Sequence, residues 1–274
     1  MKSRDDKEIN LVNKLRLLSK NEIYYIPEST KVKRVANDVI FIDEWEKYWT
    51  DNSEDTNNPP DFYSDKLSIM MDVMRVTDKE VKSGKNPTLA KESKVLKEIE
   101  ESGILSMFPN VTEDDIFLNC DSGLPTDKDH NFKAYRRQFE RTINKHSSKV
   151  ETYKRNHPKI KRNVFFIFDE STDYLIPENP KDEYKKGDIV KVHSKNIHIW
   201  FRDKFFIDLI INSNADYVIW YAPYKTLSEK SFYAHLNKNV DFYLPKAVIL
   251  DCKYHETINN LMEYDADLMR STEV

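Results

Sequence analysis

The stretch LSIMMDVMRV, residues 67–76, is a nearly continuous apolar run with a single acidic residue, Asp72, in it. An apolar run of this length fits a strand that is buried on both faces of a sheet. Pro59 and Pro60 close the polar loop before it and favour an extended exit. We therefore expect residues 61–63 to pair with residues 67–76 as a short neighbouring strand.

Helical patterns flank this strand pair on both sides. Apolar residues recur every three or four positions in residues 35–49 and, most clearly, in residues 132–153. The segment NVFFIFDE, residues 163–170, has the β-branched and aromatic composition of a strand. The first part of the chain thus predicts a helix at 35–49, strands at 61–63 and 67–76, a helix at 89–102, a strand at 116–120, a helix at 132–153 and a strand at 163–170.

The remainder of the chain continues the alternation of helices and strands. It predicts a mixed α/β fold in which residues 1–172 form a core with N-terminal helices and residues 173–274 form an α/β extension, on the same sheet or as a small second lobe. The expected elements of the extension are a helix at 201–212, a strand at 215–222, a helix at 225–236 and a strand at 246–253.

Composition excludes several classes of enzyme. The chain has 274 residues and a formal net charge of -4, with only four glycines. None of them stands in GxGxxG or GxxxxGK[ST], which argues against a dinucleotide fold and a P-loop. The seven histidines show no HExxH or HxH spacing, and Cys120 and Cys252 form no CxxC, so a zinc site is not expected.

The same composition bears on location. The amino-terminal residues are charged, and no apolar run approaches the length of a membrane span. Two distant cysteines fit a reducing compartment. We therefore expect a cytoplasmic protein without a membrane partner, whose oligomeric state the sequence leaves open.

The pair Pro60–Asp61, followed by Asp72 about ten residues later, resembles the motif of the PD-(D/E)XK nuclease superfamily. In that superfamily a helix precedes a strand pair that carries Asp and then (D/E)xK, and a later strand, helix and strand complete the core. The resemblance covers roughly residues 35–170. It implies a restriction-endonuclease-like mixed sheet flanked by helices, and a metal-dependent DNA endonuclease activity.

Burial of Asp72 in an apolar strand would cost several kcal/mol unless its charge is compensated. A divalent cation shared with Asp61 would compensate it, because Mg²⁺ or Mn²⁺ takes carboxylate and carbonyl oxygens. The resemblance implies the backbone carbonyl of Val73 as a further ligand. It also implies an outer acidic ligand from the preceding helix, for which Glu44 is the first candidate beside Asp43 and Glu46.

The chain departs from the motif at Met74, which stands where the superfamily has its lysine. Methionine can neither orient a water nor stabilise charge on a phosphate. Some divergent members recruit a polar residue from the following helix instead. Gln138 and Lys145 are the candidates, since they are seven residues apart and share one face of the predicted helix.

Simpler interpretations stand beside these. Asp61 could cap a turn after proline, and Asp72 could pair with Lys66 or Arg75. A rival (D/E)xK motif consists of Asp251 and Lys253 around Cys252, with Asp241 ten residues earlier. Too little chain follows it to complete the core. Asp169 and Glu170, at the end of their predicted strand, could border the site.

Residues 131–162 contain eleven Lys or Arg and two acidic residues, a local excess of nine positive charges. Because the apolar stripe faces inward, these charges cover the outer face, as phosphate binding requires. A solvated helix face balanced by acidic neighbours is the plain alternative. The expected contacts to the nucleic-acid backbone come from Arg136, Arg137, Arg141, Lys145 and Lys149.

The leading hypothesis is therefore a metal-dependent phosphodiester hydrolase that acts on DNA. Asp61 and Asp72 hold Mg²⁺ or Mn²⁺, Glu44 supports it, and Gln138 or Lys145 replaces the lysine. The alternative is a catalytically inactive nuclease-like module that binds nucleic acid or a protein partner, as Met74 would suggest. A third hypothesis is a phage- or restriction-related accessory protein that acts through protein contacts alone.

Overall fold

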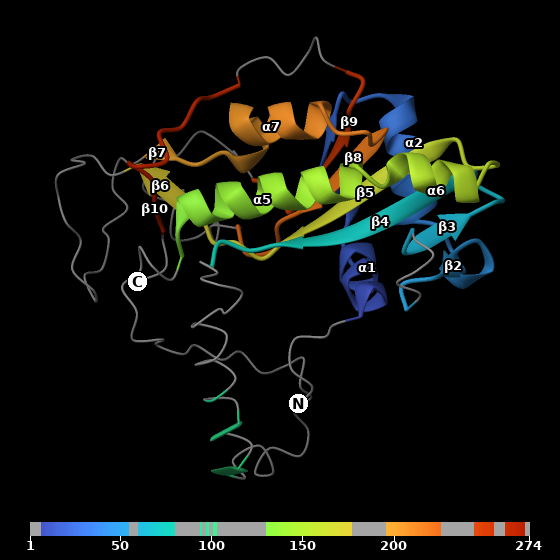
Figure 1. The fold of residues 1–274 in the computed structure, drawn as a ribbon, viewed down its shortest axis with the longest axis horizontal. Helices are drawn as coiled ribbons and strands as arrows, with labels where there is room; N and C mark the ends of the chain where they lie inside the picture. Colours follow the sequence, from blue (N-terminus) through green and yellow to red (C-terminus); the bar gives the residue numbers. More distant parts are fainter. Residues whose placement is uncertain are drawn as a thin grey trace.

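The computed structural model describes residues 7–54, 60–79, 130–176, 196–225, 244–254 and 261–271, together with residues 94, 97, 98, 101 and 102. Its centre is a seven-stranded mixed sheet with the strand order β1-β9-β8-β5-β4-β3-β2 (Figure 1). The strands are β1 (Ile23–Ile26), β2 (Thr50–Asp51), β3 (Phe62–Ser64), β4 (Ile69–Val76), β5 (Arg162–Asp169), β8 (Tyr217–Tyr221) and β9 (Ala247–Asp251).

The sheet combines an antiparallel and a parallel part. Strands β2, β3 and β4 pair antiparallel, whereas β4, β5 and β8 run parallel to one another. Strand β9 pairs antiparallel with β8 and parallel with β1. A second sheet of three short strands contains β10 (Arg270–Ser271), β6 (Tyr174–Ile176) and β7 (Asn196–Ile197).

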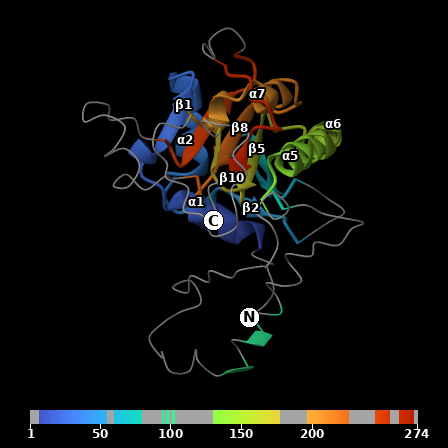
Figure 2. The same ribbon diagram turned by 90° about the vertical axis from the view of Figure 1, so that its left-hand side faces the viewer.

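Helices cover both faces of the large sheet (Figure 2). Helices α1 (Glu8–Arg16) and α2 (Thr30–Val39) bury their apolar residues against one face, in a core with Val164 and Phe166. Helices α5 (Phe132–Ser147) and α7 (Lys204–Ile211) pack on the other face. The short helix α6 (Val150–Asn156) follows α5.

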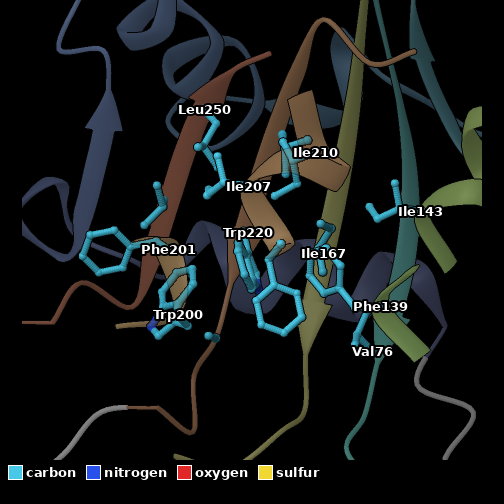
Figure 3. Close-up of a cluster of buried hydrophobic side chains, with 14 of the residues drawn as sticks. Val76, Phe139, Ile143, Ile167, Trp200, Phe201, Ile207, Ile210, Trp220 and Leu250 are labelled. Carbon is cyan, nitrogen blue, oxygen red and sulfur yellow. The ribbon is translucent and has the colours of Figure 1, made fainter. Parts of the chain in front are cut away.

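Aromatic rings fill the core under α5 and α7. Phe139 of α5 lies with its ring centroid 4.9 Å from that of Trp220 on β8, next to Ile207 and Ile210 of α7 (Figure 3). Buried residues on alternate positions of β5 serve the two faces in turn, because successive side chains of a strand point to opposite sides.

These observations confirm a mixed α/β fold with a sheet flanked by helices. The strands expected at 67–76, 163–170, 215–222 and 246–253 are present as β4, β5, β8 and β9. Strands β8 and β9 belong to the same sheet as β4 and β5, so the two ranges expected as a core and an extension are joined by backbone hydrogen bonds.

The bounds expected for the helix at 35–49 were wrong. Helix α2 begins after Ser29, whose side chain accepts a hydrogen bond from the Val32 N–H, and it ends at Val39. The indole N–H groups of Trp45 and Trp49 donate to the carbonyls of Val39 and Asp38. The two tryptophans therefore provide hydrogen-bond donors to carbonyls at the end of α2 and lie outside the helix. Their periodic spacing does not reflect a continuation of the helix.

Other boundaries also differ from the expectations. The helix expected at 132–153 is divided between α5 and α6, and β1 was not expected at all. Within 89–102 the five described residues are helical. The strand expected at 116–120 and nearly all of the helix expected at 225–236 lie outside the described residues.

Candidate functional site

Asp61 and Asp72 face each other across neighbouring strands. Strands β3 and β4 pair Phe62 with Met71 and Ser64 with Ile69. Continuing this antiparallel register by one residue places Asp61 opposite Asp72. Directly opposed residues in such a pair point to the same face of the sheet, with Cβ atoms about 4.5–5.5 Å apart. Two carboxylates thus share one position on the face that carries α5 and α6.

The backbone next to this pair is shaped by proline. The Val73 N–H donates to Oδ2 of Asp61 at 2.7 Å. The N–H and C=O of one strand residue point to the same edge, so the Val73 carbonyl also points toward β3. The register places Pro60 opposite Val73, and proline has no N–H to offer to that carbonyl. A carbonyl oxygen therefore accompanies the two carboxylates.

Two side chains from the helices contact Asp72. Nδ1 of His146, at the end of α5, lies 2.5 Å from Oδ2 of Asp72, and the Tyr153 hydroxyl of α6 donates to the same oxygen at 3.2 Å. Asp72 and Tyr153 are buried, whereas the His146 side chain is 14% exposed. The Asp72 carboxylate thus contacts an imidazole and a phenol from the helices that cover this face of the sheet.

Ionisation of both carboxyl groups would give this position an excess of negative charge. Burial, together with the neighbouring charge of Asp72, raises the pKa of Asp61 to about 8, even though the Val73 N–H opposes the shift. The charge of Glu8, in the first turn of α1, acts in the same direction. Burial, with Asp72 next, also raises the pKa of the Tyr153 hydroxyl, which keeps it protonated. A cation would relieve this excess.

The structure brings together only some of the expected site residues. Asp61, Asp72 and Val73 meet as described. Glu44 lies at a left-handed position (φ 51°) before the short helix at Trp45–Lys47, and its exposed carboxylate pairs with Lys47. It shows no contact with the aspartates. Glu8 is the outer acidic residue whose charge reaches Asp61, and the sequence had given no reason to choose it.

The two candidates for the missing lysine do not contact Asp72 in the described structure. Gln138 is half-buried and Lys145 is exposed, whereas the next residue, His146, faces the carboxylate. Met74 is buried in the core with α5. Among the described residues, His146 is therefore the basic side chain that contacts Asp72. Its place on the apolar stripe of residues 132–153, together with Tyr153, was the signal that could have identified both residues.

The simpler pairings of Asp72 are absent among the described contacts. Lys66 donates to the Lys47 carbonyl, and Arg75 pairs with Glu170. The described hydrogen bond of the Asp61 side chain comes from the Val73 N–H on the neighbouring strand and not from a local turn.

The rival motif forms a turn at the end of β9. Asp251 accepts the Lys253 N–H, and the Lys253 ammonium pairs with Asp216 at 2.5 Å. Burial, first of all, raises the pKa of the Cys252 thiol, which keeps it protonated. Asp241 lies outside the described residues.

The five basic residues expected to contact nucleic acid separate into two groups. Arg136 is half-buried, with its guanidinium 3.7 Å from Asp203 and 4.3 Å from the Phe205 ring centroid, so it joins α5 to α7. Arg137, Arg141, Lys145 and Lys149 are exposed. Arg136 is therefore an internal contact, and the other four remain on the surface.

A second group of buried charges lies at the carboxyl end of β5. Oδ2 of Asp169 accepts hydrogen bonds from the Tyr135 hydroxyl at 2.5 Å and the Trp220 indole at 2.9 Å, and the Lys225 ammonium lies 3.1 Å away. Its Oδ1 accepts from the Ser171 N–H and hydroxyl. This carboxylate is saturated by donors and does not border the Asp61–Asp72 pair through any described contact.

Two further observations concern metal binding and membrane crossing. Within the described ranges, no group of three or more His, Cys, Asp and Glu is arranged to hold a metal ion. Among the described helices, none has both the length and the apolarity needed to cross a bilayer.

Comparisons with protein-family models, with curated proteins and with solved structures give no match for this chain. The interpretation of the site therefore depends on its geometry and chemistry.

Proposed function

We propose that the chain is a metal-dependent phosphodiester hydrolase that cleaves DNA at the Asp61–Asp72 site. The observation that carries the proposal is the pair of carboxyl groups on one face of the sheet, where burial and then the charge of Asp72 raise the pKa of Asp61 to about 8. Protein folds rarely retain such an uncompensated pair for stability, and perturbed pKa values of this kind cluster at functional sites.

The residues present fit a hard divalent cation. Mg²⁺ is usually bound through one or two carboxylates and retains several waters, so a protein site with two carboxylates is sufficient. Asp61, Asp72 and the Val73 carbonyl would hold the ion. A bound Mg²⁺ or Mn²⁺ would supply a more acidic water and offset negative charge on the phosphate.

The chain's own groups complete the chemistry. Asp72 engages Nδ1 of His146, which leaves Nε2 to accept a proton from an attacking water. The Tyr153 hydroxyl, kept protonated, orients Asp72. In this proposal His146 takes over part of the role that lysine has in the PD-(D/E)XK superfamily.

The order of elements gives further support. Helix α2 precedes three antiparallel strands, β2, β3 and β4, and α5 then leads to β5, which is parallel to β4. The acidic residues lie at the start of the second strand and within the third. This order is the one expected of a restriction-endonuclease-like core, and the proposal takes the site from that analogy.

One observation favours a second candidate, a catalytically inactive module that binds nucleic acid or a protein partner. Met74 is 3% exposed and packs in the core, and among the described contacts no lysine or arginine reaches Asp72. If His146 serves only to pair with Asp72, binding could persist without cleavage.

The test is plasmid nicking by the full chain with Mg²⁺ or Mn²⁺. We expect Asp72→Asn and His146→Ala each to lower the nicking rate at least about 100-fold, since general acid–base groups contribute about 100- to 10,000-fold. Asp251→Asn, in the rival motif, is the matched control and should nick like the wild type.

Equal loss in Asp251→Asn, or nicking that persists unchanged in Asp72→Asn, would rule out the proposed site. Binding without nicking in the wild type, under both metals, would support the inactive module instead.

A further inference from the structure

The surface of α5 beside the aspartates carries a row of exposed cations. Arg141 and Lys145 lie on α5, and Lys149 lies in the turn between α5 and α6. The three are spaced by four residues and exposed, and the described structure gives no ion pair for any of them. Residues four apart on a helix are neighbours on one side, separated by about 6 Å along its axis. We call these three residues the cationic ridge.

The direction of the ridge follows from the other contacts of α5. Arg136 stacks on Phe205, and Phe139 lies 4.7 Å from Phe206, ring centroid to centroid, so this side of α5 faces α7. Lys145 follows Arg136 by nine residues, which is about half a turn around the helix at roughly 100° per residue. The ridge therefore lies on the side of α5 that faces away from α7.

That side is the one next to Asp61. Helix α7 packs in the core with Val218 of β8 and Leu250 of β9, while α5 contacts β4 (Figure 1). In the sheet, β8 and β9 lie on one side of β4 and β3 lies on the other. The side of α5 away from α7 thus faces the β3 edge, where Asp61 stands opposite Asp72.

An aromatic pair lies on the same face of the sheet. Tyr63 follows Asp61 by two residues and so points to the same side of β3. Its half-buried ring has its centroid 4.4 Å from that of His157, just after α6. Cations that track a phosphate backbone, combined with rings on which bases stack, are the two components of single-strand binding.

We infer that the site takes a single polynucleotide strand, whose phosphates lie along the cationic ridge and one of whose bases stacks on Tyr63. This inference depends on the proposed function, because it names the substrate class of the same site. A duplex keeps its bases stacked inside, so an aromatic ring next to the phosphate contributes there only if a base is unpaired.

The test is fluorescence anisotropy with labelled 20-nucleotide single strands of DNA and RNA and with the corresponding DNA duplex, in EDTA. The ridge variant is R141E/K145E/K149E. Its matched control is K20E/K31E/R34E, which reverses three cations on and before α2, the helix on the opposite face. Tyr63→Ala is the third variant.

We expect the wild type to prefer a single strand, DNA or RNA, over the duplex by at least about tenfold, because base–aromatic stacking contributes about 1–3 kcal/mol per base. The ridge variant should reduce the slope of log K against log salt by about 2, at about 0.7 per phosphate contact. Tyr63→Ala should weaken binding and leave that slope unchanged. The control should bind like the wild type.

Preference for the duplex, an unchanged slope in the ridge variant, or equal loss in the control would overturn the inference. Measuring nicking beside binding distinguishes the single-strand inference from the proposed function. Nicking that requires Asp72 but not the cationic ridge would retain the hydrolase and reject the single-strand inference. Binding that depends on the cationic ridge, without nicking under Mg²⁺ or Mn²⁺, would retain the single-strand inference and reject the hydrolase.

Discussion

Among the buried carboxylates of the described residues, the chain treats Asp169 and Asp72 in opposite ways. Asp169 is surrounded by a lysine, a tyrosine, a tryptophan and a serine, so each of its oxygens accepts at least two donors. Asp72 meets one imidazole and one phenol, and it faces another carboxylate instead of a cation. The first carboxylate is compensated by donors from the chain, whereas the second shares its position with a carboxyl group whose pKa is raised to about 8.

This difference distinguishes a structural group from a functional one. A satisfied buried network rigidifies a core, while breaking it leaves an uncompensated charge. A carboxylate pair whose charge is not compensated destabilises the fold and gains its balance from a ligand. Removing a charge from the Asp169 group should therefore lower the free energy of unfolding, whereas removing a charge from the Asp61–Asp72 pair should raise it.

The largest effect is expected at the saturated group. Lys225→Met removes the cation from Asp169, and both side chains are fully buried, so the free energy of unfolding should fall by about 3–5 kcal/mol. Urea unfolding measures it. The control is Lys253→Met, whose ammonium is exposed and pairs with Asp216, and it should cost at most about 1 kcal/mol. A loss below 1 kcal/mol in Lys225→Met would contradict the structural role.

A smaller effect is expected from metal at the unsaturated group. Mg²⁺ at about 100 times its Kd should raise the free energy of unfolding by about 2.7 kcal/mol, because it binds the folded state alone. Thermal unfolding with and without 10 mM Mg²⁺, roughly such an excess for a carboxylate site, measures this change. Asp72→Asn should abolish the shift and Asp251→Asn should keep it. A shift that is equal in all three proteins would place the ion elsewhere.

Removing one of the paired carboxylates should stabilise the metal-free protein. Asp61→Asn keeps an oxygen for the Val73 N–H and removes the like charge opposite Asp72, so we expect a gain of about 1 kcal/mol at pH 8. Urea unfolding in EDTA tests it, with Asp65→Asn as a control that should change by less than about 0.5 kcal/mol.

The gain should depend on pH. The folded-state pKa of Asp61 is raised to about 8, so this group's contribution to stability is full below its ordinary pKa of 3.8 and is lost as the pH rises to about 8. The wild type should therefore lose stability relative to Asp61→Asn between pH 5 and pH 8. A loss of equal size in both proteins would assign the pH dependence to other groups.

The smallest effect is expected at Glu8. Its charge contributes to the raised pKa of Asp61, after burial and Asp72, so Glu8→Gln should lower that pKa by less than about one unit. Carboxyl NMR titration of the metal-free protein measures it. Glu46→Gln should leave the pKa of Asp61 unchanged, and an equal change in both variants would indicate a general effect of net charge.

The strands were the part of the fold that the sequence predicted best. Continuous apolar runs such as those of β4 and β5 have few other ways to be buried, and the alternation of helices and strands fits a sheet covered on both sides. Helix ends were less predictable. The periodic Trp45 and Trp49 indicated a longer helix, yet their indoles donate to the end of α2.

By itself the sequence determined that a carboxylate would be buried in an apolar strand, since Asp72 stands within residues 67–76, and that an acidic partner could precede it. The tertiary structure decided which groups surround the pair. The register of β3 on β4 places Asp61 opposite Asp72, and the turn between α5 and α6 brings His146 and Tyr153 to one oxygen. His146 and Tyr153 follow Asp72 by 74 and 81 residues in the sequence. Their contacts with Asp72 arise from packing, which no local pattern encodes.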